Sequence, residues 1–144
     1  MGSLYKFLHI QQRIYWFIFR PSTVGVKCLI GYNDEYLLIK TAYSGDYWTL
    51  PGGGVKKSED TERSVIREVY EELGIHLKNV RFLGSYTSSV EYKKDEINCF
   101  YADVYTKDFT ISLAEVKEAK WFRKDNLPVN HSKALIKTLE FLEN

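Results

Sequence analysis

Three glutamates, Glu68, Glu71 and Glu72, stand close together near the middle of the chain. Residues three and four positions apart on a helix share one face, so this spacing would crowd the three carboxylates together. Like charges at this spacing destabilise a helix unless something neutralises them. Hard divalent cations such as Mg²⁺ and Mn²⁺ prefer oxygen ligands of this kind. The spacing therefore predicts a divalent-metal site built on a helix.

A glycine-rich loop and a helix must position these carboxylates. The run from Pro51 to Gly54 predicts a loop whose bare backbone can approach a ligand closely. We expect the helix to use Ser58 as its N-cap, with Glu59 and Asp60 in its first turn, and to end at Gly74. Its apolar residues predict one stripe that docks on a sheet, turned away from the carboxylates: Val65, Ile66, Val69, Tyr70 and Leu73.

The whole segment from Gly53 to Ile75 resembles the Nudix box. It consists of Gly53, five residues, Glu59, seven residues, Arg67-Glu68-Val69, one residue, Glu71-Glu72, one residue and Gly74-Ile75. Every fixed position of the box is filled. The resemblance is strongest over residues 24–128, and it includes Trp48-x-Leu50-Pro51 before the box and Trp121-Phe122 after it.

The resemblance implies a fold, a reaction and roles for the box residues. The implied fold is α+β, with a mixed β-sheet sandwiched between helices. The implied reaction is attack of water on phosphorus in a nucleoside diphosphate linked to another group, with Mg²⁺ or Mn²⁺ as cofactor. Glu68 and Glu72 would be the central metal ligands, with Glu71 nearby or shared and a backbone carbonyl near Gly53. Arg67 and Glu59 would pair and orient the helix.

The general base and the substrate contacts lie outside the box. We favour Glu115 as the base, with Glu118, Glu91 and Glu96 as rivals, and a solvated surface glutamate is the competing interpretation for each. Lys40 could meet a phosphate, although an ordinary surface lysine would look the same. The tyrosines Tyr43, Tyr47 and Tyr86 could stack on a base or simply pack against the domain.

The resemblance leaves several substrates open. ADP-ribose or another nucleotide sugar comes first, and a nucleoside triphosphate in a housecleaning role comes second. Dinucleoside polyphosphates and capped RNA rank lower. The competing class is a non-catalytic nucleotide-binding or regulatory module, which a metal-dependent turnover assay would separate from an enzyme.

The composition agrees with one soluble domain. The chain has 144 residues, of which 27% are charged and 44% hydrophobic, values ordinary for a globular protein. A formal net charge of +1 gives no electrostatic argument for a stable nucleic-acid partner. Cys28 and Cys99 lie in apolar stretches without zinc-site spacing, which predicts buried thiols in a reducing compartment. No segment reaches the ~20 apolar residues that span a bilayer, so we expect a cytoplasmic protein.

Apolar periodicity predicts the order of the elements. Residues 24–40 indicate a β-hairpin that turns at Asn33-Asp34. Further strands are predicted at residues 47–50, 80–87, 97–105 and 118–122, with residues 92–96 as a polar connection. A closing helix is predicted at residues 131–142.

The first twenty residues fall outside the resemblance. We divide the chain into an apolar helical extension, residues 1–20, and a Nudix domain, residues 21–144. Residues 4–19 expose more apolar surface than one helix can leave in water. Packing on the domain's own sheet, a homodimer contact and membrane-surface attachment are the three interpretations, in that order.

Overall fold

The computed structural model describes residues 22–43, 45–90 and 93–144. The predicted extension, residues 1–20, and the rival base Glu91 lie outside these ranges. The elements follow one another as β1 (Ser22–Tyr32), β2 (Glu35–Thr41), β3 (Gly52–Gly54), α2 (Thr61–Leu73), β4 (Leu77–Val90), β5 (Lys93–Val104), β6 (Val116–Arg123) and α3 (Lys133–Glu143).

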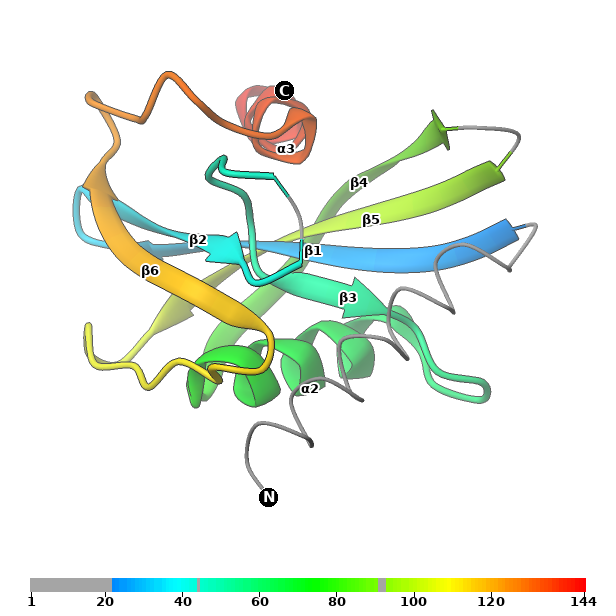
Figure 1. The fold of residues 1–144 in the computed structure, drawn as a ribbon, viewed down its shortest axis with the longest axis horizontal. Helices are drawn as coiled ribbons and strands as arrows, with labels where there is room; N and C mark the ends of the chain where they lie inside the picture. Colours follow the sequence, from blue (N-terminus) through cyan, green and yellow to red (C-terminus); the bar gives the residue numbers. More distant parts are fainter. Residues whose placement is uncertain (1–21, 44, 91–92) are drawn as a thin grey trace.

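Six strands form one mixed sheet with a helix on each face (Figure 1). The strand order is β4-β5-β1-β2-β6, and the short strand β3 pairs with β1 off this path. The central strand β1 runs parallel to β5 and antiparallel to β2 and β3. The expected mixed sheet between helices is therefore confirmed.

The local sequence correctly predicts the first hairpin but not the structure of the glycine run. Asn33 turns the chain between β1 and β2 with a φ of 52°, a conformation that asparagine tolerates. The predicted strand at residues 47–50 reduces to isolated bridges at Trp48 and Thr49. The glycine run, predicted as a loop, instead forms the strand β3, because Gly53 pairs with Val26 of β1.

The later elements are mostly longer than predicted. β4 and β5 extend to residues 77–90 and 93–104, so most of the supposed polar connection at residues 92–96 is strand. Its backbone groups are paired, because Thr23 and Val24 of β1 lie opposite Asp95 and Glu96. Among the described residues, no helix is long and apolar enough to cross a membrane.

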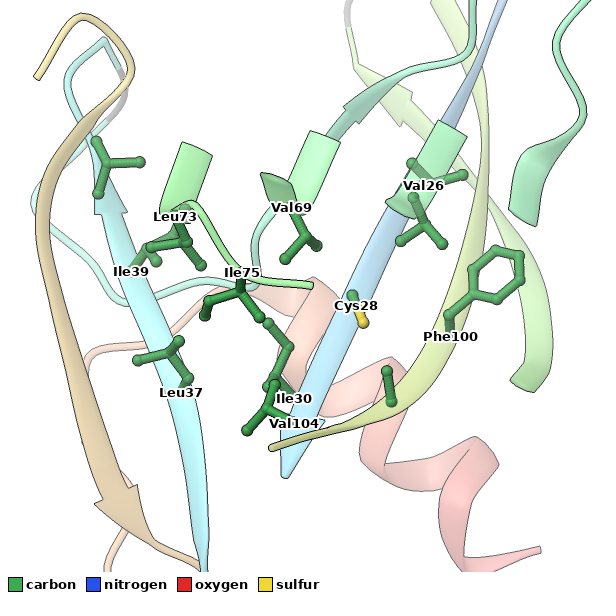
Figure 2. Packing of buried hydrophobic residues seen from close by; sticks show 13 residues of the cluster. Val26, Cys28, Ile30, Leu37, Ile39, Val69, Leu73, Ile75, Phe100 and Val104 are labelled. Carbon is green, nitrogen blue, oxygen red and sulfur yellow. The ribbon is translucent and has the colours of Figure 1, made fainter. Parts of the chain in front are cut away.

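The sheet has an apolar core on each side. On the α2 side, Val26, Cys28 and Ile30 of β1 pack against Val69 and Leu73 of the helix (Figure 2). On the α3 side, a second cluster contains Leu29, Tyr36, Leu38, Trp48, Leu50 and Leu135. Both cysteines are free and buried, as predicted, and burial raises the pKa of each thiol. The two cores fix α2 and α3 relative to β1. They therefore also fix the position of α2 relative to the glycine strand β3, which pairs with β1.

Candidate active site

The glycine run brings the backbone against the glutamate helix. A Cβ at residue 52 would overlap the carbonyl oxygen of Val26, so only glycine fits beside β1. A Cβ at residue 53 would overlap the carboxyl group of Glu68. At Gly54 a Cβ would meet nothing within 4 Å. The first two glycines therefore allow a close approach, and the third does not need to be glycine for this reason.

The helix α2 starts later than predicted. Asp60 is its N-cap, and the Asp60 carboxylate accepts a hydrogen bond of 2.7 Å from the Arg63 amide. Ser58, the predicted cap, lies in a turn with a φ of 69°. The end at Gly74 is as predicted, with a φ of 66° and an amide that donates to the Tyr70 carbonyl.

The buried face of α2 differs from the predicted apolar stripe. Val65, Val69 and Leu73 are buried, but Ile66 and Tyr70 are exposed. The remaining buried positions are polar: Ser64, Glu68 and Glu72. The helix is therefore turned about its axis toward the glutamates, which places the Ile66 and Tyr70 side of the helix in solvent.

Arg67 ties the helix to the loop that precedes it. Its Nε and Nη2 donate to the two oxygens of Glu59 at 2.8 and 2.9 Å, a bidentate ion pair. Nη2 also donates to the Gly54 carbonyl at 3.1 Å, and Nη1 donates to Glu68 and Glu71 at 3.0 and 3.2 Å. Hydrogen bonding to Arg67 lowers the pKa of Glu59 to about 2, and the same bonds raise the pKa of Arg67.

The three box glutamates are not equivalent. Glu72 and Glu68 are only 1% and 4% exposed, and both face the glycine strand. The Gly52 amide donates to Oε1 of Glu72 at 2.9 Å, which holds that carboxylate against β3. The Glu71 side chain is 41% exposed and rests on Arg67 at the rim. The structure thus gathers Glu68 and Glu72 and leaves Glu71 outside them.

The donor chemistry of this site fits a hard divalent cation. Buried carboxylates are normally paired or coordinate a metal, and Glu68 and Glu72 lie against Gly53 and the Gly52 amide of the glycine strand. In the part of the chain that the structure describes, no three His, Cys, Asp or Glu side chains form a ready-made metal cluster. The metal-ligand set of Gly53, Glu68, Glu71 and Glu72 stays a prediction, in which Glu68 and Glu72 are the best-placed members.

Glu115 reaches the same region from a distant part of the sequence. The segment between β5 and β6 is attached to the end of α2, because the Ser112 amide donates to the Glu72 carbonyl at 2.9 Å. The Glu115 amide in turn donates to the Ser112 carbonyl, and Glu115 is 3% exposed. Its rivals Glu96 and Glu118 are exposed, and Glu118 lies near Lys40. Glu115 is therefore the only one of these three that is buried next to the box helix.

This arrangement of glycine strand, ion pair and buried glutamates matches a known family. The NUDIX domain model matches residues 20–142. The chain belongs to the Nudix hydrolase family. The domain also has the family's fold: a MutT NUDIX hydrolase from Burkholderia pseudomallei superposes with a TM-score of 0.76 and 27% identity, over 85% of this chain and 99% of that one.

Curated relatives of this Nudix domain are longer proteins. An NAD-capped RNA hydrolase, NudC, from Shigella dysenteriae is 36% identical over 98 residues, which are 67% of this chain and 37% of that protein. A diphosphoinositol polyphosphate phosphohydrolase, 3-alpha, from Mus musculus is 33% identical over 96 residues, which are 63% of this chain and 56% of that protein. The chain thus spans between about a third and somewhat over half of these two relatives.

The predicted substrate contacts of the Nudix domain do not lie together. Lys40 lies on β2, where Nζ contacts Asp46 at 3.0 Å and lies 4.9 Å from the centre of the Trp48 ring. Tyr86 lies on β4, at the other end of the strand order, and is half-buried. Burial raises the pKa of Tyr86 to about 12. Tyr43 follows β2 and is exposed. Lys40, Tyr43 and Tyr86 therefore cannot be assigned to one site from this geometry.

One charged residue beside the glycine strand, Lys27, was not predicted as a site residue from the sequence. It lies on the central strand β1, directly opposite Gly52 of β3, and is half-buried. Its Nζ donates to the Leu50 carbonyl at 3.3 Å, just before the glycine run. The signal was available, since a lysine interrupts an otherwise apolar stretch from Val26 to Ile30.

Proposed function

We propose that this Nudix domain catalyses metal-dependent hydrolysis of a phosphoanhydride in a nucleoside diphosphate linked to another group. ADP-ribose or another nucleotide sugar is the first candidate substrate. The observation that carries the proposal is the burial of Glu68 and Glu72 against the glycine strand, beside the ion pair of Arg67 and Glu59. Buried carboxylates are costly unless they are paired, hydrogen-bonded or coordinate a metal ion.

Each residue of the site has a physical role in this proposal. Glu68 and Glu72, with Glu71 and the Gly53 carbonyl, would hold a Mg²⁺ or Mn²⁺ ion. When bound, such an ion neutralises charge on phosphate oxygens and lowers the pKa of bound water. Arg67 orients Glu68 by direct hydrogen bonding, and the Gly52 amide fixes Glu72.

Glu115 would act as the general base that removes a proton from the attacking water. Its support is its burial and its attachment to the Glu72 backbone through Ser112. Glu115→Gln should lower kcat by about 100-fold, within the usual range for a general base, while metal affinity changes little. Glu118→Gln is the matched control on the exposed strand β6. If pH–rate profiles show that only the Glu118 variant loses activity, the two roles must be exchanged.

The relatives support the reaction class more than the substrate. Their names describe hydrolysis of an NAD-capped RNA and of a diphosphoinositol polyphosphate. NAD and a diphosphate group both contain a phosphoanhydride, although the rest of each molecule is different. The shared feature agrees with a site that acts on linked phosphates.

A phosphate-release screen tests the proposal when it is coupled to a phosphatase, which frees phosphate from the phosphomonoester products, or, for the nucleoside triphosphates, to inorganic pyrophosphatase. The panel contains ADP-ribose, other nucleotide sugars, dinucleoside polyphosphates and nucleoside triphosphates, each with Mg²⁺, with Mn²⁺ and with a chelator. We expect metal-dependent release of nucleoside monophosphate from a nucleotide sugar. In ¹⁸O water the label should enter a phosphate product. Label on a sugar carbon, or the absence of metal-dependent turnover on the whole panel, would refute the proposal.

A further inference from the structure

Lys27 occupies an unusual place for a lysine, the middle of the central strand. Within β1 it lies opposite Gly52 on one side and Cys99 of β5 on the other. Lysine is almost never fully buried unless it is paired, and Lys27 stays half-buried although its strand is internal to the sheet. Its positive charge reaches the neighbouring strand, because it lowers the pKa of Cys99 against the larger effect of burial.

The Lys27 side chain and the box glutamates lie on opposite faces of the sheet. Along β1, Val26 and Cys28 point to the α2 core and Leu29 to the α3 core, so Lys27 points to the α3 side. Gly52 connects the two faces. Its backbone pairs with Lys27, and its amide donates to Glu72. The ammonium group is held at the Leu50 carbonyl, two residues before the Gly52 amide that holds the Glu72 carboxylate.

The described elements cover the face around Lys27 only in part. In Figure 1 the strands β1, β4 and β5 extend well beyond α3. Cys99 of β5 lies directly beside Lys27, and two residues along the strands Gly25 of β1, Ile97 of β5 and Tyr86 of β4 form the next row on this face. The three residues of this row are half-buried, although β1 and β5 are internal strands. A row with a small residue, an aliphatic side chain and a phenol ring, one step along the sheet from a lysine, suits a nucleotide.

We propose that Lys27 binds a phosphate of the substrate from the α3 side of the glycine strand, with the nucleoside toward Ile97 and Tyr86. The inference rests on the proposed function, which places the other phosphate at the carboxylate side. An ammonium group is a compact point charge that suits phosphate oxygens. The hydrogen bond to the Leu50 carbonyl holds the Lys27 ammonium group near the start of the glycine run. Lys40, the lysine favoured from sequence, instead lies in contact with Asp46 and Trp48.

Binding without catalysis tests this inference. The probes are α,β-methylene-ADP, whose diphosphate resists hydrolysis, and adenosine, which has no phosphate, both measured by calorimetry in a chelator. Lys27→Met should weaken binding of the diphosphate by about 10- to 100-fold, the range of a charge-assisted hydrogen bond. Adenosine binding should change less than about twofold. Lys27→Arg should restore most of the affinity, and Lys40→Met should leave it unchanged.

The controls separate this inference from the proposed function. If Lys27→Met does not fold, Lys27→Gln gives the same comparison, because its amide can still donate to the Leu50 carbonyl. Equal diphosphate affinity of the variant and the wild type overturns the inference. An equal loss for adenosine also overturns it, because that result indicates a structural role. A wild-type protein that binds the diphosphate through Lys27 but hydrolyses nothing on the panel would refute the proposed function alone.

Discussion

The helices α2 and α3 cover opposite faces of one sheet, but they bury different kinds of side chain. The buried residues of α3 are Ala134, Leu135 and Thr138, and the Thr138 hydroxyl is satisfied within the helix by the Ala134 carbonyl. The helix α2 buries Glu68, which accepts a hydrogen bond from Arg67 of the same helix, and Glu72, which accepts one from the Gly52 amide of β3. The helix α3 thus closes an apolar core, whereas α2 holds buried charge in a fixed place at an energetic cost.

The largest effect should come from removing a charge on the α2 side. Glu72→Gln keeps a carbonyl oxygen for the Gly52 amide, so the fold should survive. Turnover of the best substrate should fall by at least about a thousandfold, equivalent to about 4 kcal/mol of transition-state stabilisation. Thr138→Val is the matched buried polar site on α3 and should leave kcat unchanged. A Glu72→Gln enzyme with wild-type turnover would show that the glutamate face is not catalytic.

On the α3 side the large effect should be on stability. Leu135 is 1% exposed within the second core. Leu135→Ala should lower the free energy of unfolding by about 2–4 kcal/mol, because it removes buried methylene groups and leaves a cavity. Urea denaturation measures the loss. The kcat of the folded fraction should stay within twofold, and a proportionate fall in kcat would mean that α3 contributes directly to catalysis.

Two adjacent glycines give a finer test of the close approach at β3. Gly53→Ala places a methyl group against the Glu68 carboxyl, whereas Gly54→Ala meets nothing within 4 Å. We expect the first variant to lose about 10- to 100-fold in kcat, the range typical of groups that orient a metal ligand, the role proposed for Gly53 beside Glu68. Gly54→Ala should remain within about twofold. Equal behaviour of the two variants in the phosphate-release assay would contradict the packing of Glu68 on Gly53.

The contribution of the Glu59–Arg67 ion pair to the free energy of unfolding should be lost in acid. The pKa of Glu59 is lowered to about 2 from an ordinary value of 4.5, chiefly by hydrogen bonds from Arg67. Its stabilisation is therefore fully present above about pH 4.5 and is lost as the pH falls toward 2. Wild type should be about 2 kcal/mol more stable than Glu59→Gln at pH 7, after allowance for partial exposure, and this gap should close in acid.

Urea midpoints measured from pH 7 to pH 3 would reveal this change. Asp125→Asn is the control, since Asp125 also pairs with an arginine, Arg123, but on the exposed surface. Its stability difference should be negligible at every pH. A Glu59→Gln gap that does not depend on pH would indicate that packing, and not charge, accounts for the role of Glu59.

The smallest predicted effect is a gain in stability. Ser58 adopts a φ of 69° in the turn before α2, which is unfavourable for a residue with a Cβ. Ser58→Gly should raise the unfolding free energy by about 0.5–1 kcal/mol, measured as an increase in Tm. Asn33→Gly, at a φ of 52°, should give less, because asparagine tolerates this region. A destabilised Ser58→Gly protein would mean that a contact of the serine side chain stabilises the fold by more than its positive φ destabilises it.

Sequence spacing was sufficient for the fold family and for the position of α2. The box fixes where the helix must end, because Gly74 is needed at a left-handed C-cap. It also places Glu68 and Glu72 on a common face, since they are one turn apart. Periodicity then located the hairpin of β1 and β2, because local alternation and a local turn determine it.

The errors have local and long-range causes. Ile66 and Tyr70 belong to the apolar stripe by composition, but the helix is turned toward its glutamates, so both are exposed. Ser58 has good cap chemistry, yet the chain needs a turn there and Asp60 caps the helix instead. The setting of Lys27 depends on Cys99, which only the paired strands bring beside it. No window of sequence around Lys27 contains that information.

The parallel pairing of β1 with β5 has a consequence for the order in which the protein assembles. Thr23 and Asp95 are hydrogen-bonded across 72 residues of chain. During synthesis the glycine strand and α2 leave the ribosome well before β5, which fills the remaining edge of β1. Non-local pairings of this kind form late and slowly. The nascent chain would thus carry its acidic helix without a finished sheet beneath it, and the capacity for chemistry would appear only when folding is nearly complete.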